Sequence, residues 1–136
     1  HQGNIYPVPK ETGDLDVELE SGMGDETYLG ILRQHLPGVI DRVACDLVIF
    51  QAGCDPLDGD PLASLSMTQA GIVARDSYVI DTCVARGIPV VMTLGGGYSK
   101  QAWSTQHASL TKILRTHGTV RRQPSSILET NGKTAD

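Results

Sequence analysis

Three aspartates stand close together in the stretch QAGCDPLDGDPL, residues 51–62: Asp55, Asp58 and Asp60. Aspartate, glycine and proline all favour turns, so the cluster is compatible with a simple turn. Carboxylates grouped in one loop can also bind a divalent metal ion, and Asp55 is the best candidate because it stands nearest the end of an apolar run. We expect Asp58 and Asp60 to hold the loop in shape, and further metal ligands would have to come from elsewhere.

A tyrosine follows three glycines in LGGGYSK, residues 94–100. The glycines permit positive φ angles and let the backbone approach a ligand closely. Tyr98 stays protonated at neutral pH, so it can donate a hydrogen bond to an oxyanion that forms on a carbonyl group. Packing of its ring in the core is one alternative. The glycines could alternatively form a phosphate-binding site. That alternative is disfavoured because the sequence has neither G-x-G-x-x-G nor the Lys-Ser/Thr ending of a P-loop.

Both motifs follow short apolar runs, residues 47–50 and 88–94, that are typical of buried parallel strands. Helical spacing predicts a helix that begins at residue 26 and is capped by Asp25. Pro37 either interrupts this helix or begins a second one, which ends near residue 44. Two more helices are predicted over residues 68–86, capped by Thr68, and 99–117. Residues 15–19 alternate in polarity and predict a short strand with one wet face.

Strands joined by helices predict an α/β fold with a parallel sheet and helices on its faces. Ligands bind such sheets beyond the carboxyl ends of the strands, so Asp55 and Tyr98 are expected on the same rim. A sheet of three strands would leave unsatisfied edges, which indicates part of a larger domain. Residues 1–117 are assigned to this domain. Residues 118–136 are polar, without periodicity, and predict a flexible tail.

Composition narrows the functional classes. The 136 residues are 40% hydrophobic and 20% charged, with a net charge of −5, as in a soluble globular protein. No basic stripe favours nucleic-acid binding, and no apolar run has the length of a membrane span, so a cytoplasmic protein is expected. The three cysteines lack C-x-x-C spacing, which disfavours a disulfide framework or a thiolate zinc site. The four histidines do not stand at metal-ligand spacing.

The segment QAGCDPLDGDPLASLSMTQAGI, followed by MTLGGGYSK, resembles the C-terminal half of the histone deacetylase superfamily. The likeness is greatest to the bacterial and class IV-like branch. It includes NIYPVPKETGDLDVELESGMGDETYL and extends from His1 to about Leu114. The resemblance implies a three-layer α-β-α architecture of the arginase/deacetylase type, of which this chain would be the C-terminal part.

Family members hydrolyse the amide of acetyl-lysine at a zinc ion held by an Asp-His-Asp site. A pair of histidines moves the protons, and a tyrosine stabilises the oxyanion. By resemblance, Asp55 is the second zinc-ligating aspartate and Tyr98 is the oxyanion tyrosine. The resemblance also implies a channel for the acyl-lysine stem, lined by Tyr6 and Leu62, with Gly96 and Gly97 as its floor.

The chain departs from the family pattern, because the histidine pair and the Asp-x-His motif belong to the N-terminal half. His1 opens HQGN, which resembles the zinc motif, but it fits better as the histidine that ends a later strand. We therefore expect the C-terminal part of a zinc-dependent deacetylase for acetylated lysine or a related N-acetyl amine. It would be inactive alone and need the N-terminal half or another chain. A non-catalytic α/β interaction module or relic is the alternative.

Overall fold

Three helices and two parallel strands make up the part of the chain that this computed structural model describes, residue 5 and residues 7–118. Their order is α1 (Asp25–Val43), β1 (Val48–Gln51), α2 (Gln69–Val84), β2 (Val90–Thr93) and α3 (Ala102–His117). β1 and β2 are neighbours in a parallel register that places Val48 opposite Val90, and α2 is the crossover between them. The predicted α/β class and the parallel pairing of the two apolar strands are confirmed, whereas the sheet has two strands within the described residues rather than the three predicted.

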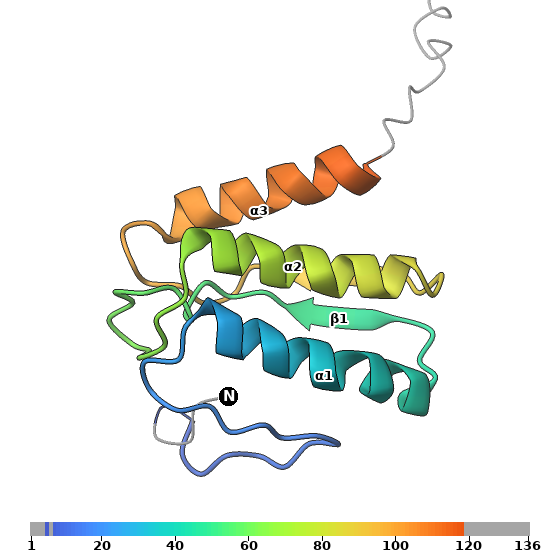
Figure 1. Cartoon of the computed structure of the whole chain (residues 1–136), viewed down its shortest axis with the longest axis horizontal. Helices are drawn as coiled ribbons and strands as arrows, with labels where there is room; N and C mark the ends of the chain where they lie inside the picture. Colours follow the sequence, from blue (N-terminus) through green and yellow to red (C-terminus); the bar gives the residue numbers. More distant parts are fainter. Residues whose placement is uncertain (1–4, 6, 119–136) are drawn as a thin grey trace, which may run out of the picture.

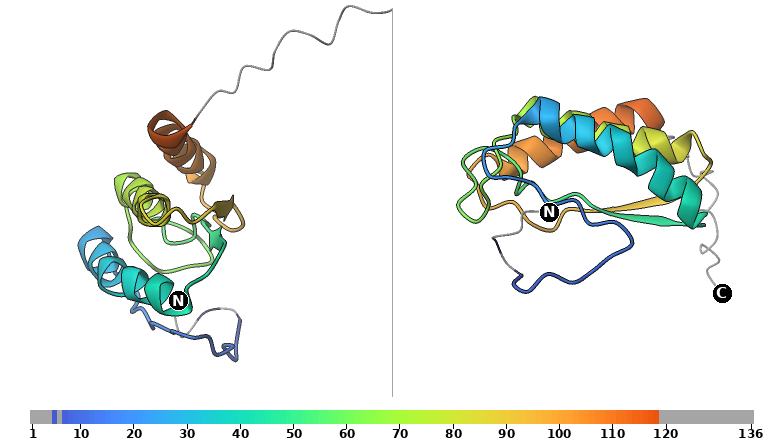
Figure 2. Two further views of the ribbon diagram at one scale, coloured as in Figure 1. Left: turned by 90° about the vertical axis from the view of Figure 1, so that its right-hand side faces the viewer. Right: turned by 60° about the horizontal axis from the view of Figure 1, so that its bottom comes forward.

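The described helices lie together on one face of the sheet (Figure 1, Figure 2). Residues of both strands alternate between half-buried and exposed, as expected when one face is covered and the other is open. Ile49 and Val91, which are register partners, are exposed on the open face. Within residues 5 and 7–118, the helices therefore supply one layer of the expected three-layer architecture.

α1 runs through Pro37 without interruption, so the predicted break is wrong. Proline has no N–H and gives up one helical hydrogen bond, a local cost that packing can offset. Leu29 and Ile40 are buried on either side of Pro37, and α1 packs against α2. Burial of both halves keeps the helix continuous. It ends at Val43, close to the predicted end, and its C-cap Ala44 has a φ of 50° in the left-handed region.

Thr68 caps α2 as predicted, because its hydroxyl oxygen accepts a hydrogen bond from the Gly71 N–H at 3.0 Å. Asp25 does not cap α1, whose N-cap is Gly24. The Asp25 carboxylate instead accepts the N–H of Thr68 at 2.8 Å and its hydroxyl at 2.6 Å. A side chain predicted to act within one helix therefore fastens the start of α1 to the start of α2.

Residues 15–19 do not form the predicted strand, and only Leu19 within them takes part in a single β-bridge. Leu15, Val17 and Leu19 line an apolar cavity of about 400 Å³ against α1. Burial of one face against a helix produces the same alternation of polarity as burial in a sheet. The alternation identified the apolar side chains that line this cavity but not the backbone structure, and none of the three is fully buried, since Leu15 is 42% exposed.

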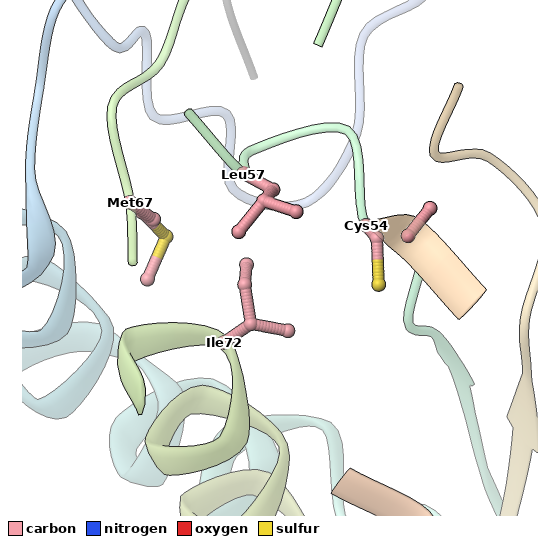
Figure 3. Close-up of a cluster of buried hydrophobic side chains, with 5 residues drawn as sticks. Cys54, Leu57, Met67 and Ile72 are labelled. Carbon is pink, nitrogen blue, oxygen red and sulfur yellow. The ribbon is translucent and has the colours of Figure 1, made fainter. Parts of the chain in front are cut away.

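The main hydrophobic cluster lies under the loop that joins β1 to α2 (Figure 3). Its members are Cys54, Leu57, Met67, Ile72 and Ala102. Leu57 and Met67 also form an isolated parallel bridge within the loop. Because the loop contributes core side chains, its backbone is fixed by packing, although it is long. The predicted tail beyond residue 118 and the N-terminal His1 lie outside the described residues.

Candidate functional site

Two loops meet beyond the carboxyl ends of β1 and β2, where the parallel sheet predicts a ligand site. They form one side of a cavity of about 690 Å³, where Asp55, Leu62 and Tyr98 line it. Residues of the N-terminal segment between 5 and 19, and Tyr28 of α1, also contribute to its lining. Backbone bonding joins the loops directly, since the Cys54 N–H donates to the Gly96 carbonyl at 3.2 Å. The expectation that Asp55 and Tyr98 share one rim agrees with this geometry.

Asp55 is half-buried and held by the neighbouring glycine loop. Its Oδ1 accepts a hydrogen bond from the Gly97 N–H at 3.0 Å. A Cβ atom added to Gly96 would collide with the carboxylate, and one added to Gly53 would come within 2.5 Å of its Oδ2. Within the described residues Oδ2 accepts no hydrogen bond, so it keeps lone pairs for a ligand. Glycines thus form a cradle that only this carboxylate fills.

Gly96 and Gly97 adopt φ angles of 92° and 105°, which residues with a Cβ rarely reach. A Cβ on Gly97 would also lie 2.7 Å from the Cβ of Cys54. The amides of Gly97 and Tyr98 donate to carboxylates of the chain itself, so they are not presented to a phosphate. The two glycines support Asp55 from behind and do not line the cavity, and their role as a channel floor stays a prediction.

Tyr98 is held by its backbone rather than by its ring. The Tyr98 N–H donates to Oδ2 of Asp60 at 2.6 Å, while 59% of the residue is exposed. Packing of the ring in the core, the alternative raised by the sequence, is therefore excluded. Tyr98 is one of the residues that line the cavity. This position suits a hydrogen-bond donor to a reacting carbonyl oxygen.

Asp60 fastens the aspartate loop, as the sequence predicted for it. The residue is buried, and its Oδ1 accepts the N–H of Leu62 at 2.9 Å. Its other oxygen receives the Tyr98 amide, so one carboxylate joins both loops. Asp58, predicted to do the same, is exposed in this loop, and its side chain makes no hydrogen bond to the described residues, so that part of the prediction has no support. Leu62 is 61% exposed at the cavity, whereas Tyr6 lies outside the described residues, and its place in the channel stays a prediction.

A buried arginine that also lines the cavity was not predicted from the sequence. Arg75 of α2 donates from Nη1 to the Gly53 carbonyl at 2.9 Å and from Nη2 to the Ala52 carbonyl at 3.1 Å. Its Nε bonds Asp76 Oδ1 at 2.7 Å, and the Ser109 hydroxyl donates to the second oxygen of Asp76. This network holds the start of the aspartate loop against α2 and α3.

The signal that could have found this network is the pair of opposite charges within an otherwise apolar helical stretch.

The thiol of Cys54, which lies next to Asp55 in the chain, is not set up as a nucleophile. Burial raises the pKa of the Cys54 thiol, and the positive charge of Arg75 only partly opposes this effect. A thiol in such surroundings carries little thiolate at neutral pH and is not a nucleophile. Cys54 is therefore a core residue, as its position in the hydrophobic cluster indicates.

Zinc fits this site in part. The Asp55 carboxylate, cradled by glycines and with one unbonded oxygen, is a suitable ligand, but a protein zinc site uses three or four. Among residues 5 and 7–118, no group of three or more histidine, cysteine, aspartate or glutamate side chains could hold a metal ion.

No helix within that part of the chain combines the length and apolar character needed to cross a membrane.

Comparison with known proteins gives consistent results. The histone deacetylase domain model matches residues 1–114. An uncharacterized protein of Picosynechococcus is 43% identical over 95 residues, covering 70% of this chain and 32% of that protein. Histone deacetylase 2 of Arabidopsis thaliana is 35% identical over 123 residues, covering 88% of this chain and 32% of that protein.

Among solved structures, the crystal structure of the HDA15 HD domain matches with a TM-score of 0.68 and 26% identity. The match covers 91% of this chain and 37% of that one. The chain thus spans about a third of the length of these relatives. The parallel sheet and its helices match one portion of a larger domain.

Proposed function

The chain belongs to the histone deacetylase family, and we propose that it supplies one side of a zinc-dependent site that hydrolyses acetylated lysine or a related N-acetyl amine. One observation carries the proposal. Asp55 and Tyr98 lie on two loops that hydrogen bonds join, and both line a single cavity at the rim of the sheet. A carboxylate and a neutral hydroxyl donor across one cavity suit the two needs of amide hydrolysis, a metal ligand and an oxyanion donor.

Asp55 is proposed as a zinc ligand through its unbonded Oδ2, with the carboxylate orientation fixed by the Gly97 amide. When bound, zinc would polarise the amide carbonyl and lower the pKa of a water molecule. Tyr98 would donate its hydroxyl proton in a hydrogen bond to the carbonyl oxygen as negative charge develops there. Leu62 and Tyr6 would pack against the methylenes of the substrate side chain.

The remaining ligands and the general base are proposed to come from polypeptide outside this chain. The open face of the sheet supports this, because Ile49 and Val91 present apolar side chains there. The 136-residue chain alone is expected to show little turnover. Asp55 supplies a single carboxylate, and one such ligand does not bind zinc tightly.

The test joins this chain to the part of Arabidopsis Histone deacetylase 2 that the alignment leaves uncovered. Zinc content and hydrolysis of an acetyl-lysine peptide are measured for the chimera and for the chain alone. In the chimera, Asp55→Ala should abolish stoichiometric zinc and activity. Tyr98→Phe should keep zinc and lower kcat by roughly 10²- to 10³-fold, the effect of losing one oxyanion donor. Asp58→Ala, an exposed aspartate of the same loop, is the matched control and should change neither.

Four results would contradict the proposal or part of it. Stoichiometric zinc in Asp55→Ala would remove Asp55 from the ligand set, and full activity in Tyr98→Phe would remove the oxyanion role. A folded chimera without zinc or turnover would favour the non-catalytic interaction module. Clear turnover by the chain alone would show instead that its own residues complete the site.

A further inference from the structure

The position of the Tyr98 hydroxyl depends on something other than packing of the ring. The residue is 59% exposed, so few contacts restrict its side chain. It follows two glycines with positive φ, a backbone that has many accessible conformations when nothing holds it. Gly96 and Gly97 are hydrogen-bonded to Cys54 and Asp55, and the hydrogen bond that holds the Tyr98 amide itself is the 2.6 Å bond to Asp60.

Asp60 is well suited to hold that amide. It is 7% exposed, and its second oxygen accepts the Leu62 N–H at 2.9 Å, which fixes the carboxylate plane. Hydrogen bonds from backbone N–H groups to a buried carboxylate are charge-assisted, so they are shorter and stronger than neutral ones. The loop around Asp60 is itself anchored, since Leu57 lies in the hydrophobic cluster and the Asp60 N–H donates to the Leu57 carbonyl at 3.2 Å.

We propose that Asp60 is a positioning residue that sets the distance between the channel wall at Leu62 and the hydroxyl donor of Tyr98. The inference rests on the proposed function and adds a residue that does not touch the substrate. One carboxylate receives both backbone amides, so a shift of Asp60 moves the wall and the donor together. Displacement of a catalytic group by about 1 Å can lower the rate by as much as 10²-fold.

The first experiment measures hydrogen exchange of the Tyr98 amide in the 136-residue chain. Asp60→Asn has the same shape but places an NH₂ group against one of the two amides, so Tyr98 should lose protection. Asp58→Asn is the matched control, because that side chain is exposed in the same loop. Unchanged protection in Asp60→Asn, or an unprotected Tyr98 amide in the wild type, would overturn the inference without reference to activity.

The second experiment measures kinetics in the chimera described above. Asp60→Asn should lower kcat by about 10- to 100-fold in the wild-type background. In the Tyr98→Phe background it should lower kcat less than about 2-fold, because the hydroxyl whose position it sets is gone. An equal loss in both backgrounds would show a general structural role and overturn the inference.

If Asp60→Asn does not fold, Asp60→Glu replaces it. That change keeps both oxygens and the charge but moves them by one methylene, and the same non-additivity with Tyr98→Phe is expected. Equal losses in both backgrounds would again overturn the inference. Failure of the proposed function has a different signature, namely a wild-type chimera without turnover alongside normal protection of the Tyr98 amide.

Discussion

Removal of the Asp76 carboxylate should destabilise the chain severely, because it strands a buried positive charge. Asp76 and Ser109 are almost fully buried, and Arg75 is 4% exposed. In Asp76→Ala the Arg75 Nε and the Ser109 hydroxyl both lose their acceptor. Breaking a buried pair by deleting one partner costs about 3–5 kcal/mol. Domains are typically stable by only about 5–15 kcal/mol, so much of the folding free energy would be lost.

The assay is urea unfolding followed by circular dichroism, with the free energy of unfolding extrapolated to water. Asp81→Ala is the matched control, since Asp81 lies on the same helix and pairs with His117 at 2.6 Å. The Asp81 side chain is 56% exposed, and such surface pairs contribute about 0–1 kcal/mol. Similar small losses in both variants, below about 1 kcal/mol, would refute the view that the Arg75–Asp76 pair anchors the aspartate loop.

Three further outcomes are expected. Gly97→Ala should lower the free energy of unfolding by more than Gly59→Ala, as measured by urea unfolding. Both glycines have positive φ, but only Gly97 lacks space for a Cβ atom. Burial raises the pKa of the Cys54 thiol, so the thiol of the unfolded chain ionises at lower pH than that of the folded chain. The free energy of unfolding should therefore fall as pH rises above roughly 8.5, the ordinary pKa of a cysteine. Melts at several pH values should show a smaller fall for Cys54→Ala. The hydrogen bond from Arg86 lowers the pKa of Asp41. This pair therefore adds to the free energy of unfolding above the ordinary aspartate pKa, and the addition is lost in more acidic solution. Melts at several pH values should show a smaller loss of stability in acid for Asp41→Asn.

The sequence was sufficient for the parts of the fold that follow from local rules. Apolar runs located β1 and β2, and Thr68 was correctly assigned as the cap of α2. The site followed from topology, since parallel strands deliver their carboxyl ends to one rim. Asp58 and Asp60 were both expected to hold the loop; two backbone hydrogen bonds support that role for Asp60, whereas the Asp58 side chain is exposed.

The wrong or missing predictions concern tertiary contacts that no local sequence pattern encodes. Burial of Leu29 and Ile40 carries α1 through Pro37, and the partner of Asp25 is a threonine far along the chain. The function of Arg75 depends on the Ala52 and Gly53 carbonyls, which the fold brings beneath it. Such long-range hydrogen bonds arise only when elements pack, so periodicity and propensity do not report them.

The structure separates what positions the proposed site from what would complete it. Asp55 is oriented by the Gly97 amide and Tyr98 by Asp60, so both are held by hydrogen bonds within the two loops. Arg75 then ties the start of the aspartate loop to α2. These contacts fix the Asp55 carboxylate and the Tyr98 backbone relative to each other, while the exposed Tyr98 ring keeps freedom about its side-chain torsions. A half-site organised in this way lowers the ordering cost when the remaining ligands arrive, which is the physical advantage of preorganisation.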